Sequence, residues 1–121
     1  MGVLADKSYA YSLEVVKVCR GLNVKKEFIL SSQLLRSGTS VGANIAEGKY
    51  AQSKSDFVSK LSISLKEANE SQYWIRLLFD SGYIDEKSFN FLTTICDEVI
   101  RLLISSIKTL KNKSQDFIPS S

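Results

Sequence analysis

Apolar residues recur three to four positions apart along most of the chain, the spacing expected when each of several α-helices buries one face. The pattern predicts four helices, over about residues 6–22, 26–48, 55–80 and 86–111. No segment shows the sustained alternation of apolar and polar residues that is typical of a half-buried strand. The chain is therefore expected to be all-α.

Residues that commonly end or begin helices separate these four segments. Helix-ending residues stand at Gly21, Asn23, Gly48 and Gly82, and candidate N-caps stand at Ser53, Ser55 and Asp85. The short connections make consecutive helices antiparallel. We therefore predict a single domain over residues 1–121, an antiparallel up-down-up-down four-helix bundle, with a frayed polar tail from about 112 to 121.

The apolar positions also predict which side chains form the core. The expected seam includes Leu34, Val41, Leu61, Leu65, Val99 and Leu103. On the third helix it follows Val58, Leu61, Leu65, Ala68, Gln72, Ile75 and Phe79. This alternation of three- and four-residue steps is typical of helices that pack like coiled coils.

The second helix contains a run of small residues, RSGTSVGANIAEGK. Its glycines could suggest a phosphate-binding P-loop, but that motif needs four residues between its glycines, then Lys followed by Ser or Thr. Here five residues separate Gly42 from Gly48, and Tyr50 follows Lys49. No strand precedes the run either, so we reject the P-loop interpretation.

Helix packing explains the small residues better. Gly38 and Gly42 lie four positions apart and share a helix face, where another backbone could approach closely. That contact could lie within the bundle or between subunits, and the sequence does not decide between them. Gly38, Gly42 and Trp74 are the candidate contacts between subunits.

The residues needed for most catalytic chemistry are missing. The chain has no histidine, which excludes imidazole bases, Ser-His or Cys-His nucleophiles and His-ligated zinc. We expect no enzymatic activity, no cofactor and no metal; a magnesium site of Glu47, Glu67 and Glu70 is a minor alternative. No apolar run approaches a membrane span and no signal peptide is visible, so we expect a cytoplasmic protein without a membrane partner.

Several polar residues of the second and third helices are expected to be structural. Arg36 and Asn44 share a helix face, and Glu47 continues it. We expect Arg36 to pair with Glu67 and to fix the register of the two helices rather than to perform chemistry. Asn44 and Glu47 are expected to make polar contacts near the turn at Gly48.

Two segments, SQLLRSGTSVGANIAEG and SKSDFVSKLSISLKEANESQYWIRLL, resemble the 23S ribosomal RNA intervening-sequence protein family. The motif is carried by Ser32, Gln33, Leu34, Arg36, Asn44, Ile45, Ala46, Glu47 and Gly48. The resemblance extends from Tyr9 to Lys111. Two features depart from the family: many members have Ile-Pro at Val41-Gly42, and the first helix lacks the usual aromatic-rich opening.

The resemblance, rather than the composition, implies how the protein assembles and what it binds. Family members are cytoplasmic bundles, commonly assembled as a five-fold ring and often encoded within insertions in ribosomal RNA genes. A related protein, the accessory protein of diversity-generating retroelements, is a pentamer that binds nucleic acid and reverse transcriptase. The implied partners are therefore further copies of this chain, forming a cyclic homo-oligomer that is pentameric by resemblance, and RNA or DNA.

Charge suggests where nucleic acid would bind. The 16 basic and 13 acidic residues give a formal charge of +3, which permits an anionic partner. In the expected topology one end of the bundle collects Lys7, Lys49, Lys54, Lys108, Lys111 and Lys113, against four acidic residues: Asp6, Glu47, Asp56 and Asp116. A ring would repeat this cluster as a basic rim, and binding would be directed at the phosphate backbone. The alternative function is an oligomeric scaffold for a protein partner, such as a reverse transcriptase or a ribosomal component.

Overall fold

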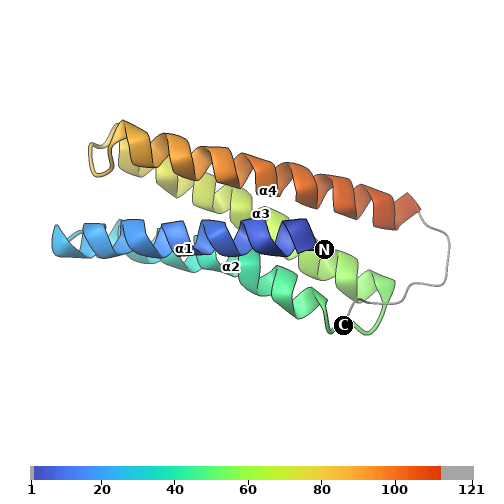
Figure 1. The fold of residues 1–121 in the computed structure, drawn as a ribbon. Helices are drawn as coiled ribbons and strands as arrows, with labels where there is room; N and C mark the ends of the chain where they lie inside the picture. Colours follow the sequence, from blue (N-terminus) through green and yellow to red (C-terminus); the bar gives the residue numbers. More distant parts are fainter. Residues whose placement is uncertain (1, 113–121) are drawn as a thin grey trace.

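The computed structural model describes residues 2–112, which form four helices. They are α1 (Gly2–Val24), α2 (Ile29–Gly48), α3 (Lys54–Asp80) and α4 (Glu86–Asn112). Consecutive helices pack side by side and α4 packs back onto α1, which closes the bundle (Figure 1). The predicted all-α up-down four-helix bundle is confirmed. The first residue of the predicted frayed tail, Asn112, ends α4. The rest of the tail, including Lys113, lies outside the described residues.

Local capping explains most of the helix ends. The Ser53 hydroxyl caps α3 by accepting a hydrogen bond from the Asp56 backbone N–H at 3.0 Å. The Asp85 carboxylate accepts one from the Ser88 N–H at 2.7 Å, and this bond lowers the pKa of Asp85. Gly82 takes a φ of +86° directly after α3, a backbone conformation that glycine adopts without strain. These three ends agree with the sequence predictions.

The end of α1 differs from its prediction. The helix continues through Gly21 and Asn23 to Val24, and the residue with positive φ is Lys26, at 63°. The Glu27 N–H donates to the Leu22 carbonyl at 2.9 Å, and the Lys26 N–H donates to the Asn23 carbonyl at 3.0 Å. This is the Schellman pattern, with Lys where Gly is usual. The prediction was wrong because a helical glycine costs only about 1 kcal/mol, which burial of Leu22 offsets.

Replacing Lys26 by Gly is expected to raise the free energy of unfolding by about 0.5–1 kcal/mol. A Cβ atom makes the left-handed conformation costly, and glycine removes that cost. Lys26→Ala keeps the Cβ and serves as the control, which we expect to leave stability nearly unchanged. Urea unfolding followed by circular dichroism measures both. Equal stability of the two variants would show that Lys26 is not strained.

The core runs along the inner faces of all four helices. Leu34, Val41, Leu61, Val99 and Leu103 are fully buried, as the sequence predicts. Leu65 is only partly buried and packs at the edge of the core. The predicted seam is therefore right on α2 and α4 and shifted in part on α3.

Three of the seven predicted positions on α3 are buried, and at the other four the buried residue is the one just before the predicted one. The buried residues are Phe57, Leu61, Ser64, Ala68, Ser71, Ile75 and Leu78. Two are serines, which an apolar pattern cannot select. The Ser64 hydroxyl donates to the Val41 carbonyl at 2.7 Å, and the Ser71 hydroxyl lies 2.7 Å from the Tyr11 hydroxyl. Because each buried hydroxyl has a partner, the core tolerates them.

Small residues of α2 allow close packing within the chain. A Cβ atom on Gly38 would lie 2.9 Å from both γ-carbons of Val15 on α1. One on Gly42 would lie 3.1 Å from the Ser12 hydroxyl, and one on Gly48 would lie 2.9 Å from the ring of Phe57. A contact within the bundle therefore accounts for these glycines. A contact between subunits at Gly38 or Gly42 stays a prediction.

Candidate functional site

The start of α1, the α2–α3 turn and the end of α4 lie at one end of the bundle (Figure 1), and each of these segments carries lysines. We call this the basic end; its described lysines are Lys7, Lys49, Lys54, Lys108 and Lys111. Lys7 forms an ion pair with Glu98 at 2.8 Å, which lowers the pKa of that carboxyl. Lys49, Lys108 and Lys111 are exposed, and no carboxylate within residues 2–112 pairs with them.

Three acidic groups near this end are already engaged, and a fourth, Asp6 on α1, is exposed. Glu47 accepts a hydrogen bond from the Lys60 ammonium at 2.9 Å. The Asp56 carboxylate accepts one from the Gln52 N–H at 3.2 Å, and it lies in the first turn of α3, where the helix dipole favours negative charge. Because Glu98 is paired as well, the lysines without an acidic partner leave this end with local positive charge.

The α2–α3 turn presents an aromatic side chain at the same end. Tyr50 follows Lys49 and is 79% exposed, whereas the next residue, Ala51, is only 6% exposed and anchors the turn in the core. The Tyr50 N–H donates to the Glu47 carbonyl at 3.0 Å, which continues the helical turn past Gly48. The sequence analysis missed Tyr50; the available signal was an aromatic residue beside a lysine in a short polar connection.

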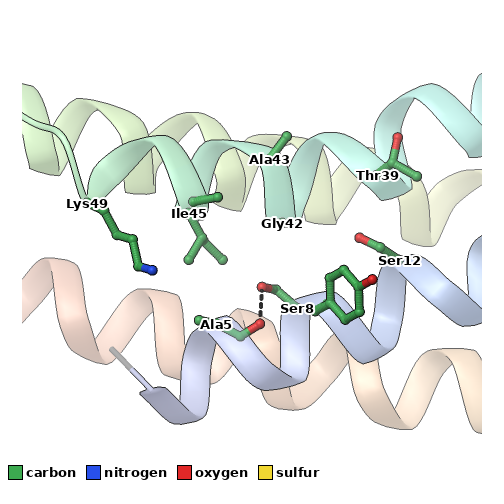
Figure 2. Close-up of a pocket in the computed structure, with 10 residues that line it drawn as sticks. Ala5, Ser8, Ser12, Thr39, Gly42, Ala43, Ile45 and Lys49 are labelled. Atoms are coloured by element: carbon green, nitrogen blue, oxygen red, sulfur yellow. Dashed lines mark hydrogen bonds between the residues drawn. The ribbon is translucent and has the colours of Figure 1, made fainter. Parts of the chain in front are cut away.

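An apolar groove of about 540 Å³ runs between α1 and α2 (Figure 2). It is lined by Ala5, Ser8, Tyr9, Ser12, Thr39, Gly42, Ala43, Ile45, Ala46 and Lys49. The Ser8 hydroxyl donates to the Ala5 carbonyl at 3.0 Å, and the Thr39 hydroxyl donates to the Leu35 carbonyl at 2.6 Å. Since these hydroxyls are satisfied within their own helices, the groove offers mainly apolar surface.

Arg36 links α2 to α3 through carboxylates. Its guanidinium lies 3.3 Å from the Glu67 carboxylate, which is the predicted ion pair, and it also binds Glu70. The Trp74 indole N–H donates to Glu70 at 3.0 Å, and this bond, followed by the charge of Arg36, lowers the pKa of Glu70. Such an arrangement fixes the register of two helices. Trp74 itself is partly buried, and its predicted subunit contact stays untested.

The other motif residues make separate local contacts. The Asn44 amide donates to the Ser40 carbonyl at 2.8 Å, one turn back along α2. Glu47 binds Lys60 and does not join Glu67 and Glu70, which Arg36 holds. Within residues 2–112 no group of three or more acidic or cysteine side chains is placed to hold a metal ion. The three glutamates of the minor magnesium alternative therefore do not form one cluster.

Both thiols lie in the core. The Cys96 thiol donates to the Ala68 carbonyl at 3.6 Å, and burial raises its pKa to about 11. Burial also raises the pKa of Cys19. Because the thiolate is the nucleophile, both cysteines are poor nucleophiles at neutral pH.

These features define a small antiparallel four-helix-bundle protein whose second helix is rich in small residues. The model of the family described as 23S rRNA-intervening sequence protein matches residues 3–105, and the chain belongs to this family. The predicted resemblance is therefore confirmed at the level of the family. None of the helices found in residues 2–112 is long and apolar enough to cross a membrane.

One solved structure is closely similar. It is a protein of unknown function from the S23 ribosomal protein family of Bacteroides thetaiotaomicron, with 46% sequence identity and a TM-score of 0.84. The match covers 87% of this chain and 98% of that chain. No curated protein matches the chain.

Proposed function

We propose that this chain is a non-enzymatic, oligomeric, cytoplasmic protein that binds the phosphate backbone of nucleic acid through its basic end. The observation that carries the proposal is the gathering of Lys49, Lys108 and Lys111 at one end, with no acidic partner within the described chain, while Glu98 and Glu47 are paired with Lys7 and Lys60. The family's name, which refers to an intervening sequence of 23S rRNA, agrees with a nucleic-acid partner.

The non-enzymatic part rests on the available chemistry. The sequence contains no histidine, and the two cysteines are buried, with pKa values raised by burial. Arg36, Glu67 and Glu70 form a charged cluster that joins α2 to α3. The ion pairs within the cluster neutralise most of its charge. None of these groups has the paired nucleophile and base that acyl or phosphoryl transfer by side chains requires.

The oligomeric part rests on two apolar surfaces. The α1–α2 groove lies on one side, and a depression of about 340 Å³ lies between α3 and α4, on the other side of the bundle. Leu65, Ile104 and Ile107 line its apolar part, and Lys108, Lys111 and Asn112 line the part nearest the basic end. A cyclic ring needs two different surfaces on each copy, because its contacts are head-to-tail. The pentameric number comes from family resemblance. Light scattering at micromolar concentration tests this part, and a monomer would contradict it.

Oligomerisation would raise the affinity of the basic end for nucleic acid by increasing the number of phosphate contacts. Each phosphate neutralised by a lysine releases condensed counterions, so affinity grows with the number of contacts and falls with salt. Three lysines on one chain give few contacts. A ring that repeats them around an axis gives a larger continuous basic surface.

Charge reversal at the basic end tests the proposal. The triple variant Lys49→Glu, Lys108→Glu, Lys111→Glu is expected to lower affinity for nucleic acid at low salt on the order of 100-fold. The matched control reverses Lys17, Arg20 and Lys87 at the opposite end, which changes the net charge equally. Fluorescence anisotropy with labelled structured RNA and duplex DNA measures both. Circular dichroism and light scattering confirm that fold and assembly persist.

The control variant distinguishes a localised binding site from an effect of net charge alone. We expect the control variant to lose less than about fivefold, because its lysine and arginine positions lie at the far end and act only through long-range attraction. Equal losses in the two variants would contradict a localised site. An unchanged affinity of the basic-end variant would contradict binding through this end.

A scaffold for a protein partner is the second candidate, and the α1–α2 groove is the observation that favours it. An uncovered apolar groove beside the exposed Tyr9 and Leu13 could accept a partner's helix. A partner that stays bound after nuclease treatment would favour this function. Release of the partner by nuclease would favour nucleic-acid binding.

A further inference from the structure

Tyr50 holds an exposed aromatic ring where the fold does not need one. Within residues 2–112 its side chain has no hydrogen bond, ion pair or ring contact. The turn is anchored by its neighbour Ala51 and by the cap at Ser53. Burial and turn formation therefore leave the choice of an aromatic residue at this position unexplained.

The surroundings of Tyr50 suit unpaired bases. Proteins that bind single strands combine a basic surface that follows the backbone with aromatic rings on which bases stack. Tyr50 directly follows Lys49 and lies at the same end of the bundle as Lys108 and Lys111. In a duplex the bases are already stacked and paired, so only an unpaired base can reach the ring.

The other exposed aromatic residues are less suitable. Tyr73 is packed edge-to-face against Trp74 at 5.1 Å, and Trp74 is bonded to Glu70. That region of α3 carries Glu67 and Glu70, which bind Arg36, so its charge is mixed rather than basic. Tyr9 lines the apolar groove between α1 and α2. Phe28 and Phe91 are exposed as well, at 59% and 51%, but Tyr50 is the most exposed aromatic side chain within residues 2–112, and it shares its end of the bundle with three lysines that have no acidic partner there.

We propose that Tyr50 is a stacking platform for an unpaired base, and that it makes the basic end selective for single-stranded nucleic acid over duplex. This inference rests on the proposed function, because the lysines bring the strand to the turn. Phosphate contacts supply affinity without regard to pairing, and stacking on Tyr50 supplies the discrimination.

The test compares Tyr50→Ala, Tyr50→Phe and the control Tyr73→Ala. Three labelled probes of about 20 nucleotides are titrated at one salt concentration: single-stranded RNA, single-stranded DNA of the same sequence, and the DNA duplex. Tyr50→Ala is expected to lose about tenfold in affinity for single strands and less than about twofold for the duplex. Tyr50→Phe and Tyr73→Ala are expected to bind like the wild type, because stacking needs the ring and not the hydroxyl.

The outcomes separate this inference from the proposed function. Loss on both single strands, or on the RNA strand alone, supports stacking and identifies which strand is bound. An unchanged Tyr50→Ala variant, or an equal loss on the duplex, overturns the inference while the binding function stands. If the wild type binds none of the three probes, the proposed function itself fails. Because Tyr50 is exposed, circular dichroism should show an intact fold in every variant.

Discussion

Leu61→Ala is expected to lower the free energy of unfolding by about 2–5 kcal/mol, the range for large-to-small changes in a packed core. Leu61 is 0% exposed and lies on the face of α3 that meets the other helices. Leu65 lies one turn further along the same helix, but it borders the depression between α3 and α4. Leu65→Ala should therefore cost only about 1–2 kcal/mol, because less apolar area leaves water there on folding.

This pair of variants decides which face of α3 is buried. Both remove the same atoms from the same helix, so helix propensity and unfolded-state effects cancel. Urea unfolding at several protein concentrations measures the two losses and separates folding from any effect of Leu65 on assembly. A larger loss at Leu65 than at Leu61 would mean that α3 is rotated so that Leu65, rather than Leu61, lies deepest in the core.

Gly38→Leu is expected to destabilise the bundle by about 3 kcal/mol or more, or to prevent folding. The first atom of any side chain at this position already lies 2.9 Å from two carbons of Val15. Val15 is fully buried and β-branched, so it cannot move aside cheaply. Overpacking of this kind forces strained rotamers or backbone shifts.

A smaller series keeps this prediction testable if the leucine variant does not fold. Gly38→Ala is expected to cost about 1–3 kcal/mol through the same clash, and Val15→Ala in the same chain should recover part of that loss. Gly21→Ala is the control, because nothing lies within 4 Å of its added Cβ on α1. It should stabilise the protein by up to about 1 kcal/mol through helix propensity. Destabilisation by Gly21→Ala equal to that of Gly38→Ala would contradict the packing account.

The sequence predicted the helices well because amphipathic periodicity is a property of each helix alone. Asp85 and Ser53 cap their helices as expected, since a cap depends on neighbouring residues only. The face of α3 was assigned only in part correctly because Ser64 and Ser71 are polar in the sequence but find hydrogen-bond partners on other helices. Those partners exist only in the folded bundle.

Those parts of the candidate site that depend on residue charge and helix order were predictable from the sequence. Arg36 and Glu67 carry opposite charges on adjacent helices, and the structure joins them. The basic end followed from topology, but the pairing of Lys7 with Glu98 depends on how α1 meets α4, which no local pattern encodes. Tyr50 was missed because its significance depends on exposure, and an aromatic residue is normally assigned to a core or an interface.

The salt dependence of binding tests the central claim most directly. The affinity of the wild type for a labelled single strand is measured between about 50 and 200 mM salt, with the assembly state checked at each concentration. Three backbone contacts on one chain predict a slope of about −2 in log affinity against log salt, and a ring that engages several copies predicts a steeper slope. A slope near zero, or no binding at the lowest salt, would contradict backbone-directed binding through the basic end.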